Sequence, residues 1–318
     1  MRGKIIKGVG GFYYVHAEDG AVYECRAKGI FRKEKIKPLV GDNVEFSVLD
    51  EEKRTGNVDI LLPRRNELIR PAAANVDQAM IVFALTSPKP NLNLLDRFLI
   101  LMNRQDIPVI ICLNKTDLAD EEQIQELAAV YQNCGCEVCF ISVAQRQGLE
   151  RVRSFLEAKT TVLAGPSGVG KSSLTNTFLS EKHMETGEVS KKIDRGKHTT
   201  RHTELLVLPP VETGTEKRCD SIPYQINENA EIQDPNGSYL LDTPGFSSLY
   251  LQDIEYGELK NYFSEFTPYA EYCRFQGCMH MKEPDCAVKE AVAEGKIQRP
   301  RYESYLLLAR ELRERRKY

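Results

Sequence analysis

Hydrophobic and polar residues alternate over short distances in the first part of the chain. Three segments are rich in β-branched and aromatic residues and contain Gly turns: IIKGVGGFYYVHAEDGAVYECRA (5–27), LVGDNVEFSVLD (39–50) and GNVDILLP (56–63). Short, closely spaced strands of this kind predict a small β-barrel domain over residues 1–70. The following RNELIRPAA (65–73) contains a proline and is predicted to be a linker.

From residue 76 the pattern changes to short apolar runs that alternate with helical patterns. The predicted strands are AMIVFAL (79–85), PVIICLN (108–114), CEVCFISV (136–143) and TTVLA (160–164), and later TELLVLP and SYLL. The predicted helices are LNLLDRFLILMNRQ (92–105), EEQIQELAAVYQN (121–133), GLERVRSFLEA (148–158) and SSLTNTFL (172–179). This alternation predicts a parallel, doubly wound α/β domain over 71–250, with ligands beyond the carboxyl ends of its strands. Residues 251–318 are expected to be helical and end in an amphipathic helix.

Composition narrows the class of protein. The 318 residues suggest two or three domains, and 42% hydrophobic and 28% charged residues fit a soluble globular protein. No apolar run approaches the ~18 residues of a membrane span, and the N-terminus lacks a signal-peptide core, so we expect a cytoplasmic protein without membrane contact. Nine cysteines, an odd number, favour free thiols or metal ligands over disulfides.

The net charge of −3 conceals three basic segments, at 26–37, 191–202 and 309–318. They are either solvated faces or contacts for phosphate backbones, and charge alone does not decide between the two.

The sequence NKTD (114–117) follows an apolar run and matches the guanine-recognition motif of GTP-binding proteins. Asp117 can accept hydrogen bonds from N1–H and the exocyclic amine of guanine, whereas adenine would leave its carboxylate unpaired. Asn114 is expected to tie loops together and contact N7, and Lys115 to cover the ring or ribose. Two further positions are expected beside the base in the loop FISVAQRQGL: Ser142 and the backbone at Val143.

The sequence GPSGVGKS (165–172) fits the phosphate-loop pattern GxxxxGK[ST] between a predicted strand and helix. Backbone N–H groups of such a loop surround a phosphate, and the following helix adds its positive N-terminal end. Lys171 is expected to bridge the β- and γ-phosphates as a catalytic group, and the Ser172 hydroxyl to coordinate Mg²⁺. The residues expected to bind the phosphates of GTP or GDP are Gly165, Pro166, Ser167, Gly168, Val169, Gly170, Lys171, Ser172 and Ser173. A Gly-rich turn without ligand is the alternative.

Two segments further along carry features of nucleotide switches. Asp242-Thr-Pro-Gly245 fits the DxxG element that meets Mg²⁺ and the γ-phosphate. In GKHTTR (196–201), Thr200 is predicted to close over Mg²⁺ and the γ-phosphate, with Thr199 in reserve; the alternative is a pair of surface threonines. The elements thus run base motif, base-lining loop, phosphate loop, first switch, second switch, which is the order of a circularly permuted GTPase. Both switches then lie next to the C-terminal segment in the chain.

The segment CRFQGCMHMKEPDC (273–286) has the spacing of a metal site. Three thiolates and one imidazole predict a closed, structural zinc ion bound by Cys273, Cys278, His280 and Cys286. Isolated thiols beside a surface histidine are the alternative. The cysteines at 134, 136 and 139 lie at the entry to a predicted core strand and are expected to pack as free thiols.

With these motifs together, the chain resembles the RsgA family of small ribosomal subunit biogenesis GTPases over nearly its whole length. The resemblance implies an N-terminal barrel of the OB type, GTP hydrolysis stimulated by the small subunit, and binding to ribosomal RNA through the barrel and the zinc domain. It implies a role in late subunit maturation, and nothing in the sequence demands more than a monomer. A permuted GTPase for the large subunit and a non-catalytic RNA-binding scaffold are the competing hypotheses.

Two features depart from common GTPase patterns. The polar excursion 209–237 is longer than the family usually has, and is expected at the tip of a hairpin between the switch strands. Phe246 follows DxxG where Ras-like enzymes place a water-orienting Gln, a feature that the family shares. Phe246 cannot orient water, so we predict a catalytic role for His198; the alternative is that His198 contacts RNA or packs.

Overall fold

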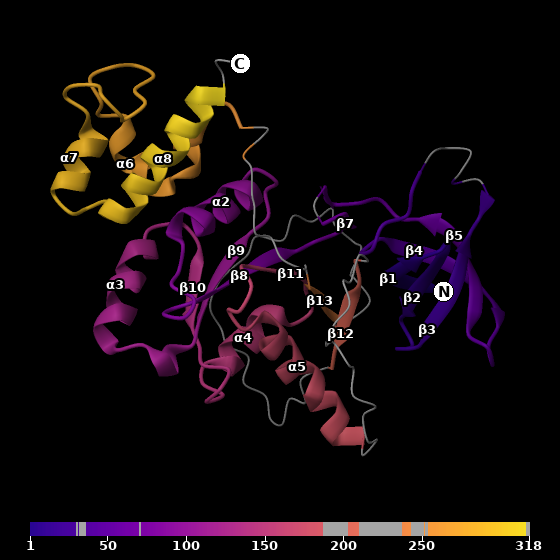
Figure 1. The fold of residues 1–318 in the computed structure, drawn as a ribbon. Helices are drawn as coiled ribbons and strands as arrows, with labels where there is room; N and C mark the ends of the chain where they lie inside the picture. The colour runs from indigo at the N-terminus through magenta and orange to yellow at the C-terminus, as the bar shows by residue number, and fades with distance from the viewer. Residues whose placement is uncertain are drawn as a thin grey trace. The chain divides into compact units, whose positions relative to one another are not determined.

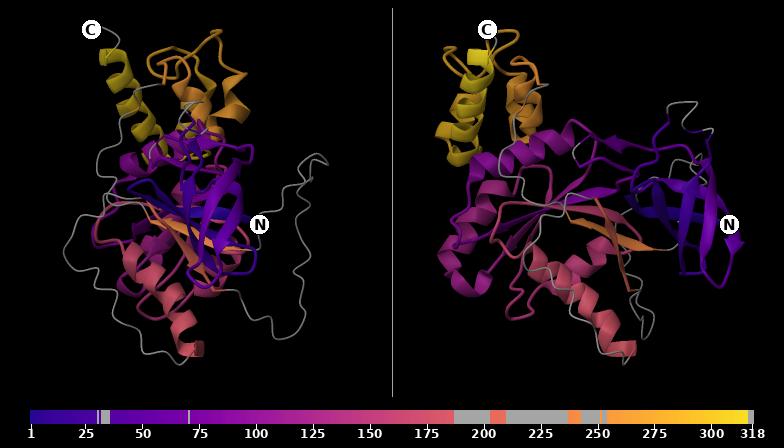
Figure 2. Two further views of the ribbon diagram at one scale, coloured as in Figure 1. Left: turned by 90° about the vertical axis from the view of Figure 1, so that its right-hand side faces the viewer. Right: turned by 45° about the vertical axis from the view of Figure 1, so that its right-hand side comes forward.

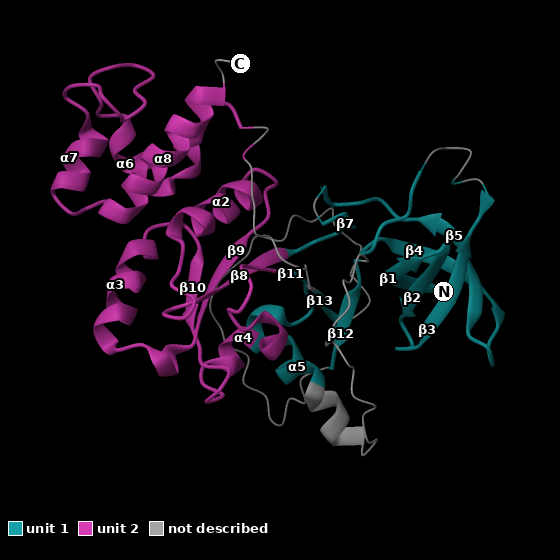
Figure 3. Ribbon diagram, viewed as in Figure 1, with its two compact units in different colours: residues 1–77, 153–162, 175–244 teal, residues 78–152, 163–174, 245–318 magenta. Residues whose placement is uncertain are grey.

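The computed structural model describes residues 1–29, 31, 36–69, 71–186, 203–209, 237–242, 251 and 254–315 (Figure 1). It divides into two compact units, each assembled from separate stretches of the chain (Figure 3). The first comprises Met1–Asp77, Arg153–Val162 and Thr175–Pro244, and the second Gln78–Val152, Leu163–Leu174 and Gly245–Tyr318.

A closed five-stranded barrel forms the N-terminal part of the first unit (Figure 2). Its strands are β1 (Arg2–Val9), β2 (Phe12–Ala17), β3 (Val22–Ala27), β4 (Asn43–Asp50) and β5 (Thr55–Leu61), hydrogen-bonded in the order β1-β2-β3-β5-β4. Alternate side chains point inward and make the core, so that Ile5, Val15 and Val58 are completely buried. The predicted barrel is confirmed.

The stretch predicted to be a linker, 65–73, contains short paired strands among its described residues. Two short strands, β6 (Glu67–Leu68) and β7 (Ala73–Ala74), pair antiparallel. Asn66 donates from its side chain to the carbonyl of Val76 at 2.7 Å, and Asn75 accepts from the backbone N–H of Arg65 at 2.9 Å. These two asparagine side chains hydrogen-bond across the turn. The pattern of hydrophobic residues in the sequence does not reveal such side-chain hydrogen bonds.

The first unit also contains β12 (Leu205–Leu208), which pairs antiparallel with β13 (Ser238–Asp242), so the predicted pairing of the two switch strands is confirmed. Two polar contacts join the barrel to Thr160 and to Tyr239 of β13, which belong to the same unit. The fully buried Lys4 donates to the Thr160 hydroxyl at 3.0 Å, and His16 Nδ1 lies 2.9 Å from the Tyr239 hydroxyl.

The second unit contains three parallel strands, β8 (Gln78–Ala84), β9 (Val109–Asn114) and β10 (Glu137–Phe140). Every residue of β8 is buried, which explains its continuous apolar run. Strands β8, β9 and β10 belong to a six-stranded sheet of order β10-β9-β8-β11-β13-β12, in which β11 is Thr160–Ala164. The sheet is mixed rather than wholly parallel because of the β12–β13 pair. The intervening helices are α2 (Leu92–Asn103), η1 (Thr116–Leu118), α3 (Glu121–Tyr131), α4 (Leu149–Leu156) and α5 (Lys171–Thr186).

The C-terminal part of the second unit is helical, as predicted. Its elements are η2 (Leu259–Tyr262), η3 (Ser264–Phe266), α6 (Thr267–Ala270), α7 (Ala287–Ala293) and α8 (Arg299–Arg315). Helix α8 packs beside α2, where Arg97 bonds to Glu311 at 3.3 Å (Figure 1). Arg301, which is also on α8 and is buried, donates to Glu265 at 2.6 Å and to Asp96. None of the described helices is both long and apolar enough to span a bilayer.

Candidate functional site

Asn114 is the residue through which three predicted site segments meet. It ends β9 and is only 2% exposed. Its side-chain amide donates to the carbonyl of Val169 at 2.8 Å, and its side-chain oxygen accepts from the N–H of Val143 at 3.2 Å. The base motif, the base-lining loop and the phosphate loop are therefore held together by one buried side chain.

Lys115 follows in the left-handed conformation, at φ 69°. Its ammonium group donates to the carbonyl of Gly168 at 2.8 Å and to the carbonyl of Ser87. The lysine stem is thus stretched between the phosphate loop and the loop after β8. Sequence analysis missed Ser87, although its place just beyond the carboxyl end of an apolar strand was an available signal.

Asp117 is held by a neighbouring hydroxyl. Ser142, which is completely buried, donates to one carboxylate oxygen of Asp117 at 2.5 Å and accepts from the N–H of Gln145 at 3.0 Å. These contacts fix the rotation of the carboxylate, which is the group that would face the edge of a base.

The phosphate loop connects β11 to α5 and needs glycine at two positions. A Cβ on Gly165, at φ 140°, would lie 2.1 Å from the carbonyl oxygen of Val82. A Cβ on Gly170, at φ 101°, would lie 2.3 Å from the side-chain nitrogen of Asn114. Only glycine fits both the space and the positive φ, and it lets the loop pack directly against the base motif.

The remaining loop residues lie around the start of α5. Lys171, the first residue of α5, donates to the carbonyls of Gly165 at 2.8 Å and Pro166 at 2.7 Å. Val169 is buried, whereas Ser167, Gly168, Ser172 and Ser173 are exposed and accessible to a ligand.

Several predicted site residues fall outside the described residues: His198, Thr199, Thr200, Gly245 and the neighbouring Phe246. Asp242 is the last residue of β13, and the structure describes its backbone only. Residues 210–236, most of the predicted excursion, also lie outside.

The predicted zinc ligands converge in the C-terminal segment. One ligand atom from each of Cys273, Cys278, His280 and Cys286 lies within 4.8 Å of all the others. His280 Nδ1 is 3.5 Å from the Cys273 sulfur and 3.4 Å from the Cys286 sulfur. Residues separated in sequence thus form one compact S₃N donor set.

Electrostatics fit a cation at this cluster. Burial raises the pKa of Cys278, raises the pKa of Cys286 to about 12, and lowers the pKa of His280 to about 4. Buried thiolates would repel one another without a cation, and a metal ligand histidine must be neutral. Three sulfurs with one neutral imidazole suit tetrahedral zinc.

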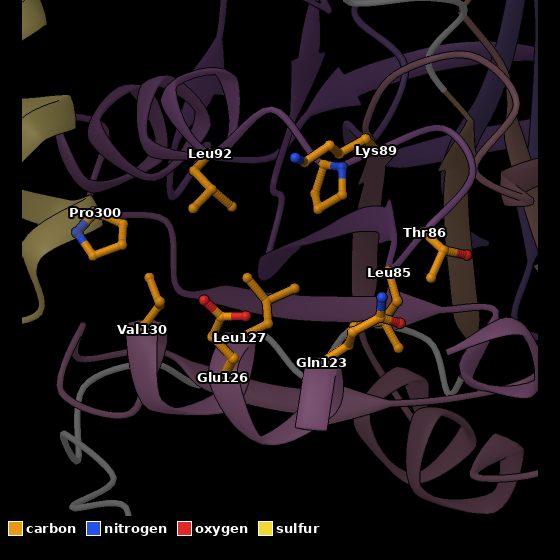
Figure 4. Close-up of a pocket in the computed structure, with 10 residues that line it drawn as sticks. Leu85, Thr86, Lys89, Leu92, Gln123, Glu126, Leu127, Val130 and Pro300 are labelled. Atoms are coloured by element: carbon orange, nitrogen blue, oxygen red, sulfur yellow. The ribbon is translucent and has the colours of Figure 1, made fainter. Parts of the chain in front are cut away.

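A separate pocket of about 460 Å³ lies between the loop after β8 and helix α3 (Figure 4). None of the residues predicted to bind nucleotide lines it. The lining residues are Leu85, Thr86, Lys89, Pro90, Leu92, Gln123, Glu126, Leu127, Val130 and Pro300.

Comparison with known proteins assigns the family. The RsgA GTPase family model matches residues 61–212, and the RsgA N-terminal domain model matches residues 2–56. The small ribosomal subunit biogenesis GTPase RsgA of Agathobacter rectalis is 49% identical over 100% of both chains. The chain belongs to the RsgA GTPase family. The RsgA of Alkaliphilus metalliredigens is 46% identical, over 100% of this chain and 99% of its own.

Two solved structures show the same fold as this RsgA family member. The crystal structure of YloQ, described as a circularly permuted GTPase, has a TM-score of 0.72 at 39% identity and covers 99% of this chain and 95% of its own. YjeQ from Thermotoga maritima has a TM-score of 0.75 at 32% identity, with 98% of each chain covered. The predicted family, permuted GTPase fold and N-terminal barrel are confirmed.

Proposed function

We propose that this protein is a GTP hydrolase that acts in the assembly of the small ribosomal subunit, as a monomer in the cytoplasm. The observation that carries the proposal is the junction at Asn114, which brings a guanine-recognition motif against a phosphate loop. Relatives that match the entire chain are named as small ribosomal subunit biogenesis GTPases, which supports the small subunit over the large one.

The guanine base is bound by the motif at 114–117 and its lining loop. Asp117, held by Ser142, accepts from the N1–H and amine of guanine. Asn114 faces N7, Lys115 covers the ring or ribose, and Val143 offers its backbone to the base. Adenine lacks the donors that Asp117 requires, so its binding leaves a carboxylate without partners.

The phosphates of GTP or GDP are bound by the loop and the switches. The backbone N–H groups of 165–173 surround the β-phosphate, and Lys171 stabilises the charge that develops on the transferred phosphoryl group. Ser172, Thr200 and Asp242 would hold Mg²⁺, which would supply positive charge to the phosphates. Gly245 and either Thr200 or Thr199 meet the γ-phosphate.

Attack by water requires a group other than the one used by Ras-like enzymes. Phe246 has no hydrogen-bonding group, so hydrolysis is slow until another residue orients the nucleophile. His198, in the first switch segment, orients the attacking water when the small subunit docks.

Cys273, Cys278, His280 and Cys286 of the C-terminal cluster would hold one zinc ion, which would supply cohesion rather than catalysis. Of three domains, at 1–70, 71–250 and 251–318, the first and last contact ribosomal RNA. The GTP form favours the subunit-binding conformation through the switch residues, and loss of the γ-phosphate releases it.

The deciding experiment measures phosphate release from GTP by the purified protein, alone and with small or large subunits. We expect slow turnover alone and strong stimulation by small subunits only. The matched variants are Lys171→Ala, expected to abolish turnover, and His198→Ala, expected to abolish stimulation while nucleotide binding remains. Stimulation by large subunits alone would overturn the small-subunit assignment, and no turnover under any condition would favour an RNA-binding scaffold.

A further inference from the structure

The pocket between the loop after β8 and helix α3 has a mostly apolar lining and a volume of about 460 Å³ (Figure 4). That volume falls within the range of about 300–1,000 Å³ that is typical of small-molecule sites. Its apolar lining includes Leu85, Leu127 and Val130, which are 7%, 8% and 6% exposed. Leu85 directly follows β8, so the pocket lies at the carboxyl end of a parallel strand, where α/β sheets bind their ligands.

Three polar side chains in this lining have no partner among the described residues. The Thr86 hydroxyl is buried and makes no hydrogen bond. Lys89, from the loop after β8, and Glu126, from α3, line opposite walls of the pocket (Figure 4). Neither side chain forms an ion pair or a hydrogen bond with another described residue. The pocket therefore offers one hydroxyl, one cation and one anion to a ligand.

These groups define the chemistry of a matching ligand. A carboxylate on the ligand can accept from both the Thr86 hydroxyl and the Lys89 ammonium group. An ammonium group on the ligand can donate to the Glu126 carboxylate. An aliphatic body between the two charges would cover the apolar lining and remove it from water. The buried hydroxyl would then gain the partner that it lacks, which removes the cost of leaving it unpaired.

The separation of the two charges sets the size of the ligand. Lys89 and Glu126 do not form an ion pair with each other, although both line the same pocket. A free α-amino acid carries its ammonium and carboxylate groups on one carbon atom, whereas a dipeptide carries them at the two ends of a short chain. A dipeptide with aliphatic side chains therefore matches the walls and the lining better than a single amino acid does.

The loop that lines the pocket also contacts the candidate nucleotide site. The carbonyl of Ser87 accepts from the ammonium group of Lys115 in the base motif. Pro88 lies beside the phosphate loop, since a Cβ on Gly168 would be 3.9 Å from the proline ring. Because Ser87 and Pro88 lie between two residues that line the pocket, a ligand that fixes the pocket side of this loop also fixes the partner of Lys115.

We propose that this pocket is an effector site for a small aliphatic zwitterion of the size of a dipeptide, and that its occupancy strengthens nucleotide binding. The effect on nucleotide rests on the proposed function, whereas binding of the zwitterion does not. Coupling between two sites is reciprocal, so bound nucleotide strengthens binding of the zwitterion by the same factor. The hydrogen bond between Ser87 and Lys115 carries this coupling.

The test is isothermal titration calorimetry of the full-length protein with leucyl-leucine as the probe, without nucleotide and with saturating GDP. We expect one dipeptide per chain and an affinity about 5-fold or more higher in the presence of GDP. N-acetyl-leucyl-leucine amide has the same side chains but neither charge, and should bind at least about 10-fold more weakly because it cannot form the charged hydrogen bonds. Leucine should also bind more weakly than the dipeptide.

Matched variants locate the probe. Thr86→Val and Glu126→Gln should each weaken leucyl-leucine binding by about 10-fold or more, because each removes a hydrogen bond to a charged group. Thr86→Val removes a hydroxyl without a partner, so the ligand-free variant should remain folded, with an unchanged or higher melting temperature. Glu122→Gln, at an exposed position of α3 that does not line the pocket, should bind as the wild type does.

Absence of leucyl-leucine binding, or equal binding by the wild type and both pocket variants, would overturn the proposed site. Equal affinity with and without GDP, in a protein that binds GDP, would overturn the coupling. A protein that binds leucyl-leucine through Thr86 and Glu126 but does not bind GDP would support the pocket and refute the proposed nucleotide function, so the two failures are distinguishable.

Discussion

The side-chain amide of Asn114 donates to the carbonyl of Val169 at 2.8 Å, across 55 residues of chain. In this arrangement the motif proposed to select the base and the loop proposed to bind phosphate share one buried hydrogen bond. A residue that precedes the phosphate loop in sequence therefore helps to determine the conformation of that loop. Because the same side chain also accepts from Val143, its removal affects two loops at once.

Asn114→Ala is expected to weaken GDP binding by about 10- to 100-fold. The change leaves the carbonyl of Val169 and the N–H of Val143 without their partner, and a buried unpaired polar group costs about 1–3 kcal/mol. Isothermal titration calorimetry with GDP measures the effect. Asn103→Ala, on an exposed position at the end of α2, is the control and should bind normally. Equal affinities for the two variants would refute a joining role for Asn114.

Asp117→Asn is expected to change the base preference of the protein from guanine to xanthine. The amide can donate to the carbonyl at position 2 of xanthine but cannot accept from both guanine donors, so GDP affinity should fall by about 100-fold or more while xanthosine diphosphate affinity rises. Competition binding with the two nucleotides measures the ratio. Asp106→Asn, outside the motif, should leave the preference for guanine intact. An unchanged preference in Asp117→Asn would place the base elsewhere.

Cys278→Ser is expected to lower zinc affinity by more than about 100-fold, since even outer partners of metal ligands contribute about 10- to 100-fold. The loss should appear as less than one zinc per chain in metal analysis and as a lower melting temperature of the C-terminal segment. Cys139→Ser removes a sulfur outside the cluster and should retain one zinc. Full zinc content in Cys278→Ser would show that the four residues do not form the site.

Arg301→Met is expected to destabilise the protein by about 3–5 kcal/mol. Its guanidinium group is 2% exposed and pairs with Glu265 and Asp96, which would be left as buried, uncompensated carboxylates. Urea unfolding measures the change. Arg299→Met, at a side chain 81% exposed, should alter stability by less than about 0.5 kcal/mol. Similar losses of unfolding free energy in the two arginine variants would show that the buried ion pairs of Arg301 do not stabilise the packing of α8.

Glu311 makes the packing of α8 sensitive to acid. A hydrogen bond from Arg97 holds the pKa of Glu311 below its usual value of 4.5. A depressed folded-state pKa means that the unfolded chain takes up a proton first as pH falls. The stabilisation is therefore complete above about pH 4.5 and is lost below it. Melting temperatures of wild type and Glu311→Gln should differ at pH 7 and converge as pH falls through the depressed pKa of Glu311. Glu314→Gln, at an exposed position, should follow the wild type throughout. A difference between wild type and Glu311→Gln that does not change with pH would exclude an electrostatic origin.

Features that depend on neighbours in the chain were predictable from the sequence. The phosphate-loop pattern, the NKTD motif and the spacing of the candidate zinc ligands are contiguous patterns, because each needs particular residues within a few positions. The barrel strands and the buried strand β8 were also predictable. Alternating apolar and polar residues indicate a strand buried on one face, and a continuous apolar run indicates a strand buried on both faces.

Only the tertiary structure decided which polar groups pair over long distances. Lys4 looks like a surface residue in the sequence but is completely buried against Thr160, and Arg301 looks like part of a solvated basic helix but is buried between two carboxylates. The carbonyl of Ser87 likewise becomes a contact for Lys115 only when two loops meet. Hydrogen-bond partners and desolvation depend on which surfaces pack together, and local patterns of hydrophobicity carry no information about partners more than a hundred residues apart.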